Sequence, residues 1–103
     1  MATDRERARL SLRADLPWEA QLGLKAIEAE FIRATRRSGT FASQHEGWAV
    51  IREELDELWD EVKRNGDVTA LRKEAIQVGA MALRFLTDCA PRLEPEEEEE
   101  SDG

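Results

Sequence analysis

The sequence has few of the features that would place it in a membrane or in an oxidising compartment. No stretch reaches 18 apolar residues, so no transmembrane helix is predicted. The one cysteine, Cys89, excludes an internal disulfide and favours a reducing compartment. The first ten residues are charged throughout and lack the apolar centre of a signal peptide. These absences together predict a cytoplasmic protein with no membrane partner.

The sequence also lacks the excess of basic residues that nucleic-acid-binding proteins usually have. The chain has 15 Lys and Arg against 23 Asp and Glu, a formal net charge of −8. Most of the excess lies in residues 91–103, where one arginine stands beside seven acids, so the rest of the chain is nearly balanced. Because no concentrated basic surface is present, we expect no nucleic-acid partner. Like-charge repulsion predicts that 91–103 is a disordered acidic tail.

Strand patterns are absent, and three segments show the 3.6-residue periodicity of amphipathic helices. The first covers 17–37 and stops at Ser38-Gly39. The second opens with a Ser-x-x-Glu capping box at 43–46 and closes at Asn65-Gly66. The third is capped by Asp67 and runs to about residue 89, before a proline. The predicted fold is all-α, with a helical domain over 17–90 and an N-terminal arm over 1–16 that has room for a short helix at 4–13.

Three long helices in 103 residues give a thin monomer. The third helix is apolar over most of its circumference, so it needs neighbours on most sides. Its small residues predict close helix approach; they are Ala75, Gly79, Ala80 and Ala82. Trp48 and Trp59 fall in the apolar arc of the second helix, and core packing is their expected function. We therefore expect a helical bundle that a second copy of the chain completes.

The acids of the second helix are unevenly placed. At 100° per residue, Glu54, Glu57 and Glu61 form one stripe beside the apolar arc. Such a stripe is mildly unfavourable unless cations meet it, although an ordinary solvated face would show the same pattern. On the third helix, Glu74 lies inside the apolar arc. A carboxylate there has to be paired, protonated or bound to a metal.

The turn at Asn65-Gly66 predicts that the second and third helices are antiparallel. Glu57 lies nine residues before Gly66 and Glu74 lies eight after it, so the two occupy similar heights. The residues expected to converge are Glu54, Glu57, Glu74 and Gln77. Oxygen ligands of this kind suit a hard cation such as Mg²⁺. An ion pair between Glu74 and Arg33 or Arg52 is the structural alternative, and spacing alone does not separate the two.

The same residues resemble a known motif. Glu54-Leu55-Asp56-Glu57, a 16-residue spacer and Glu74-Ala75-Ile76-Gln77 are similar to the E-x-x-E, hairpin, E-x-x-D signature of the MazG-like all-α nucleoside triphosphate pyrophosphohydrolases. The surrounding text also resembles a small, phage-type branch of that superfamily, notably HEGWAVIREELDELWDEVK and LRKEAIQVGAMALRFL. The similarity covers roughly residues 31–89.

The resemblance implies a cytoplasmic hydrolase on the MazG-like bundle, assembled as a dimer or a dimer of dimers. It would cleave the α–β phosphoanhydride of (deoxy)nucleoside triphosphates with Mg²⁺ or Mn²⁺. Glu54, Glu57 and Glu74 match the three glutamate ligands, and Glu57 with Glu54 beside it would do the proton chemistry. Gln77 stands where the family has aspartate. Its carbonyl oxygen is still a possible ligand, but it adds no negative charge, which puts turnover in question.

Other residues near this site have two readings each. Arg84, Lys73 and Arg33 are candidates for contacting substrate phosphates, and ordinary surface cations are the alternative. His45 and Cys89 have no metal-binding or catalytic partners in the sequence and are read as structural. A different class of function also fits the fold, namely a catalytically weak or silent helical dimer that binds nucleotide, metal or another protein. A bundle with an ion-paired Glu74 is the third reading.

Overall fold

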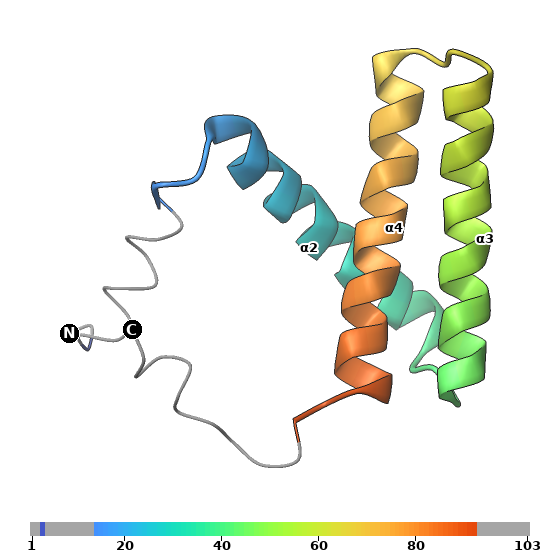
Figure 1. The fold of residues 1–103 in the computed structure, drawn as a ribbon. Helices are drawn as coiled ribbons and strands as arrows, with labels where there is room; N and C mark the ends of the chain where they lie inside the picture. The colour runs from blue at the N-terminus through green and yellow to red at the C-terminus, as the bar shows by residue number, and fades with distance from the viewer. Residues whose placement is uncertain (1–2, 4–13, 93–103) are drawn as a thin grey trace. The chain divides into compact units, whose positions relative to one another are not determined.

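The structure is a computed structural model that describes Thr3 and residues 14–92. This part of the chain contains three helices and no strand: α2 (Trp18–Ser38), α3 (Gln44–Lys63) and α4 (Val68–Cys89) (Figure 1). The all-helical prediction is confirmed, and every helix end lies within one or two residues of its expected position. The expected short helix at 4–13 and most of the acidic tail lie outside the described residues.

The helix ends follow from local hydrogen bonds. The Ser43 hydroxyl caps α3 by accepting a bond from the Glu46 N–H at 3.0 Å, and the Glu46 carboxylate accepts one from the N–H of Ala42. Asp67 caps α4 in the same way, accepting from the Ala70 N–H at 2.8 Å. At the end of α2, Gly39 adopts a left-handed φ of 75°, a conformation that glycine enters without steric cost.

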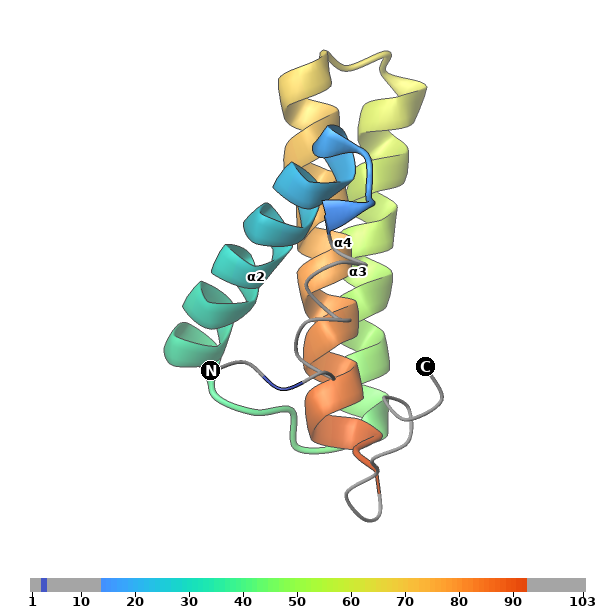
Figure 2. The ribbon, with the colours of Figure 1, turned by 90° about the vertical axis from the view of Figure 1, so that its left-hand side faces the viewer.

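The chain divides into two units, and the unit over Lys25–Pro91 holds everything that bears on a site. In it, α3 and α4 lie antiparallel and side by side in both ribbon views (Figures 1 and 2). A tight turn at Arg64–Asp67 joins them, with Asn65 at a φ of 56° and the Gly66 N–H bonded to the Glu61 carbonyl at 2.8 Å. The other unit contributes the first turns of α2, where the Gln21 side-chain amide donates to the Leu16 carbonyl.

Close contacts within Lys25–Pro91 occur where side chains are absent or small. A Cβ at Gly79 would lie 2.7 Å from the Ile27 side chain, so glycine permits α2 to approach α4. A Cβ at Gly47 would lie equally close to Phe85, so α3 and α4 also meet at a glycine. Among the predicted small contact residues, Gly79 and Ala80 are covered, whereas Ala75 and Ala82 face solvent.

The hydrophobic core is small for helices of this length. Four apolar side chains of the described residues are buried, namely Ala34, Phe41, Ala80 and Met81. The expectation that Trp48 and Trp59 pack in the core is wrong, because they are 53% and 56% exposed. They lie on the side of α3 that α4 does not cover, together with the exposed Leu55 and Val62. No helix in the described ranges is long and apolar enough to cross a membrane.

Candidate metal centre

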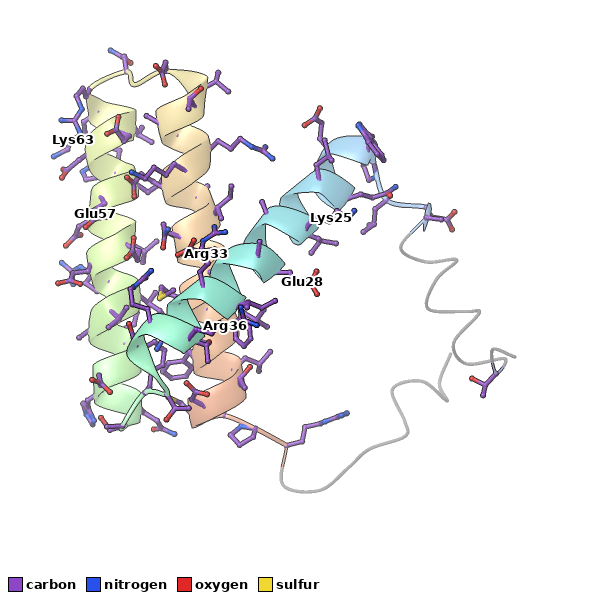
Figure 3. The ribbon with its side chains drawn as sticks, turned by 180° about the vertical axis from the view of Figure 1, so that it is seen from behind. Lys25, Glu28, Arg33, Arg36, Glu57 and Lys63 are labelled. Carbon is purple, nitrogen blue, oxygen red and sulfur yellow. The ribbon has the colours of Figure 1, made fainter. Side chains whose placement is uncertain are left out.

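Three glutamates of the α3–α4 hairpin meet at one height. Glu54 and Glu57 are one turn apart on α3, and Glu74 faces them from α4. Each offers a carboxylate oxygen, and these oxygens all lie within 4.8 Å of one another. Glu54 and Glu74 are half-buried, while Glu57 is exposed on the side of α3 seen in Figure 3. The hairpin turn thus brings Glu74 of α4 close to two carboxylates of α3 that lie 17 and 20 residues before it in the sequence.

The cluster is electrostatically strained. Burial and the negative charges of Glu57, Glu74 and Glu53 together raise the pKa of Glu54 to about 7, and burial is the largest of these causes. Burial also raises the pKa of Glu74, with Glu57 again adding to the effect and Lys73 opposing it. The Oε1 atom of Glu54 is buried and has no hydrogen-bond partner. An acceptor in this position is costly unless a proton or a cation meets it.

Ion pairing does not explain the cluster. Arg33, one proposed partner of Glu74, bonds instead to Glu30 at 2.7 Å. Arg52, the other, pairs with Asp56 at 3.3 Å on the solvent side of α3. Glu74 itself forms no ion pair within the described part of the chain. The structural alternative that the sequence left open is therefore wrong in both of its forms.

Glu61, the outer member of the acidic stripe, forms an ion pair. Its Oε2 atom bonds to Arg64 at 2.9 Å, next to the hairpin turn. Its charge still contributes, as the last of several causes, to the raised pKa of Glu74. Glu61 is therefore a neighbour of the three-carboxylate cluster and not a member of it.

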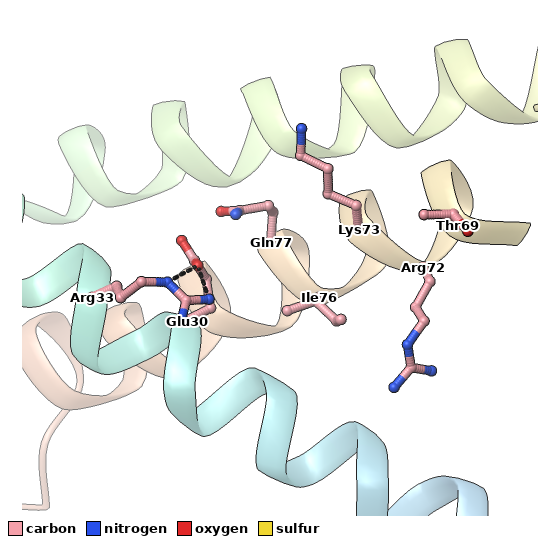
Figure 4. A pocket seen from close by; sticks show the side chains of 7 residues that line it. All are labelled: Glu30, Arg33, Thr69, Arg72, Lys73, Ile76 and Gln77. Atoms are coloured by element: carbon pink, nitrogen blue, oxygen red, sulfur yellow. Dashed lines mark hydrogen bonds and ion pairs between the residues drawn. The ribbon is translucent and has the colours of Figure 1, made fainter.

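Gln77 lies at the edge of the cluster, toward α2. With Glu30, Arg33, Lys73 and Ile76 it lines a pocket of about 340 Å³ between α2 and α4 (Figure 4). Burial alone would raise the pKa of Glu30, but hydrogen bonds from Arg33 and Gln77 and the charges of Arg33 and Arg37 outweigh it, so this pKa is lowered. The Gln77 amide thus has a carboxylate partner outside the cluster. Its function as a metal ligand stays a prediction.

Of the three cations nominated for phosphate contact, one is in an unexpected place. Lys73 and Arg33 are exposed, as surface cations are, and both line the pocket of Figure 4. Arg84 is only 5% exposed, so reading it as a surface cation is wrong. Its Nη2 atom donates to the Gly39 carbonyl at 2.7 Å, which ties α4 to the loop that follows α2.

Arg84 also lines a second pocket, of about 300 Å³, which borders the cluster. Its walls include Arg37 and Ser38 at the end of α2, Glu54 on α3 and Gln77 on α4. Sequence reasoning missed this pocket, because Thr40 and Phe41 of the loop between α2 and α3 form part of its lining. It also missed Glu30, which is 5% exposed. The spacing of Glu30 from Arg33 and Arg37, three and seven residues, is the signal that places them on one helix face.

The two residues read as structural occupy peripheral positions. His45 is exposed in the first turn of α3. Cys89 is half-buried at the end of α4, where its Sγ atom lies 3.6 Å from the Ser43 carbonyl, and burial raises the pKa of its thiol. A thiol with a raised pKa is a weak nucleophile at neutral pH. Neither residue reaches the cluster defined by Glu54, Glu57 and Glu74.

The chain was compared with models of protein families, with curated proteins and with solved structures, and none of them matches. The family resemblance therefore rests on the sequence motifs, and the chemistry of the cluster has to carry any functional assignment.

Proposed function

We propose that this protein is a metal-dependent nucleotide pyrophosphohydrolase, which cleaves (deoxy)nucleoside triphosphates between the α and β phosphates. The observation that carries the proposal is the convergence of Glu54, Glu57 and Glu74, with one buried carboxylate oxygen left unpartnered. The motif spacing in the sequence adds the reaction class. Magnesium is the first candidate for the cation and manganese the second.

The donor set fits such a cation. Mg²⁺ and Mn²⁺ prefer oxygen ligands, and Mg²⁺ in proteins typically keeps several waters while it binds a few carboxylates and substrate phosphates. Glu54 and Glu74 are the half-buried members and would hold the cation from two helices, with the exposed Glu57 as the third carboxylate. Burial, and after it the charges of neighbouring carboxylates, raises the pKa of both Glu54 and Glu74, and a bound cation would oppose both effects. A bound cation would neutralise phosphate oxygens and help to orient the attacking water.

The protein's own contribution to the reaction is proton transfer and positioning. Attack by water on phosphorus breaks the α–β phosphoanhydride bond, forms a nucleoside monophosphate and releases pyrophosphate. The water has to lose a proton, and Glu57 is the exposed carboxylate of the cluster, so we assign the acceptor function to it. Glu54, whose carboxyl has a pKa of about 7 in the metal-free protein, is the second candidate.

The test of this function is product analysis. With Mg²⁺ or Mn²⁺ present, the protein is expected to convert a nucleoside triphosphate into monophosphate and pyrophosphate, which ³¹P NMR distinguishes from diphosphate and orthophosphate. Chelation of the metal should stop the reaction. Release of orthophosphate as the first product would contradict the proposed bond.

The exposed apolar face of α3 favours an assembly of two copies. Trp48, Leu55, Trp59 and Val62 recur at helical spacing along one stripe, and Leu86 of α4 is 59% exposed. An apolar stripe of this length on a protein with so small a core indicates a surface that is covered in solution. We propose a homodimer through this face, and a dimer of dimers remains the alternative assembly. The same face is the specific observation in favour of the second function, a protein-interaction module.

The substitution that tests the dimer is Trp59→Glu, which places a negative charge within the apolar stripe. The wild-type protein is expected to have twice the chain mass of 11.7 kDa in light scattering, and the variant to shift toward the monomer. Glu53→Lys, on the exposed acidic side of α3, is the matched control and should leave the mass unchanged. A wild-type mass of one chain would refute the dimer.

A further inference from the structure

Arg84 is a buried cation without an anion. Its side chain is almost fully covered, with the guanidinium carbon 4.2 Å from the centre of the Phe41 ring. Its Nη2 atom donates to the Gly39 carbonyl and its Nη1 atom lies 3.4 Å from the Met81 sulfur, and all of these partners are uncharged. No carboxylate of the described residues forms an ion pair with it. A buried charge in this state is costly unless a counterion completes its surroundings.

The Nε atom of Arg84 is buried and has no hydrogen-bond partner. The residue lines the pocket of about 300 Å³ that Arg37 also lines, so two arginines border the same space. Arg37 is mostly exposed, and its contact with Glu30 is long, at 4.0 Å. Ser38 and Thr40, which carry hydroxyl groups, line the pocket as well.

Two acidic residues also border the pocket, Glu46 and Glu54, and neither forms an ion pair with Arg84. Glu46 accepts a hydrogen bond from the Ala42 N–H in its own helix cap. Glu54 belongs both to this pocket and to the glutamate cluster. A cation bound at the cluster would offset the charge of its carboxylate. An anion in the pocket would then meet two arginines and a Glu54 whose charge the cation offsets.

We infer that the pocket formed by Arg37, Ser38, Thr40 and Arg84 binds a phosphate group, so that the loop between α2 and α3 holds the phosphate chain of the substrate beside the metal cluster. The inference rests on the proposed function for the identity of the substrate, but the phosphate site itself does not. Arginine suits this ligand because its planar fork of N–H donors matches phosphate oxygens, and the hydroxyl groups add neutral donors. Glu54 is the residue shared by the two sites, which makes them neighbours.

The probe for this site is inorganic pyrophosphate, titrated calorimetrically into the full chain with Mg²⁺ present. Arg84→Gln is expected to weaken pyrophosphate binding by about tenfold or more, because a charge-assisted hydrogen bond and a countercharge are lost. Arg37→Gln should weaken it severalfold. Arg36→Gln is the matched control, since Arg36 is an exposed neighbour that does not line the pocket, and its pyrophosphate affinity should equal the wild type.

Arg37→Gln keeps the test decisive if Arg84→Gln does not fold, because Arg37 is an exposed side chain whose loss should leave the fold intact. Pyrophosphate affinity unchanged in Arg37→Gln and in any folded Arg84→Gln would overturn the phosphate site. If Arg36→Gln weakens pyrophosphate binding equally, the phosphate site is overturned too, because the effect would then come only from the change in net charge. If both pocket variants weaken pyrophosphate binding but no triphosphate is hydrolysed, the phosphate site stands and the proposed function fails. If hydrolysis proceeds with an unchanged KM in both variants, the function stands and the phosphate site falls.

Discussion

Replacing Glu54 by Gln is expected to stabilise the metal-free protein at pH 8. The pKa of Glu54 is raised from 4.5 to about 7, so its ionised form destabilises the fold. The contribution of Glu54 to the free energy of unfolding should therefore fall as the pH rises from about 4.5 to about 7, and stay level above that. A shift of this size corresponds to about 3 kcal/mol, and solvent screening at a half-buried site lowers the expected gain to about 1–2 kcal/mol.

Urea unfolding at pH 5 and pH 8, with a chelator present, measures this effect. The variant should match the wild type at pH 5 and exceed it at pH 8. Glu30 does not interfere in this window, because its lowered pKa keeps it ionised throughout, and its own contribution is lost only at more acidic pH. Glu53→Gln is the control: the charge of this exposed neighbour is the smallest of the causes that raise the pKa of Glu54, so neither value should change by more than about 0.5 kcal/mol. A Glu54→Gln variant less stable than wild type at pH 8 would contradict the strained cluster.

Divalent cations are expected to stabilise the folded protein more than the Glu54→Gln substitution does. A ligand that binds only the folded state at a hundredfold excess over its Kd stabilises by about 2.7 kcal/mol, which is roughly 10 °C in Tm for a domain of this size. Mg²⁺ or Mn²⁺ should therefore raise the wild-type Tm by several degrees or more at pH 8. Glu74→Gln removes one ligand and should abolish most of the rise.

The control for the metal effect is again Glu53→Gln, which keeps the cluster intact and removes one negative charge from the chain, as Glu74→Gln does. Its Tm should rise with Mg²⁺ as in the wild type. If Glu74→Gln and Glu53→Gln respond to the cation equally, the rise comes from diffuse screening of an acidic chain and not from a site. The comparison thus separates a built metal centre from a charged helix face.

Much of the fold follows from local sequence signals. The caps at Ser43 and Asp67 and the glycine at position 39 set the helix ends, and each acts through hydrogen bonds or backbone preference within a few residues. The proximity of Glu57 and Glu74 can also be predicted from the sequence. A tight turn between two helices fixes their relative heights, so counting residues from Gly66 is enough.

The remainder depends on contacts that a helical wheel does not contain. The wheel of α3 shows an apolar arc that includes Trp48 and Trp59, but it does not show which part of the arc α4 covers. The burial of Arg84 depends on where the loop after α2 places the Gly39 carbonyl and the Phe41 ring. Gln77 was expected to face the cluster, and its contact with Glu30 depends on how α2 crosses α4.

The most direct test of the metal-centre assignment is pyrophosphate release from a panel of common and modified (deoxy)nucleoside triphosphates, measured with Mg²⁺, with Mn²⁺ and with a chelator. Glu57→Gln and Glu74→Gln are compared with Glu53→Gln in the same assay. Metal-dependent release that falls by about a hundredfold in the first two variants and persists in the third is the predicted result. Equal activity in all three variants, or no release from any nucleotide by the folded wild-type protein, would contradict it.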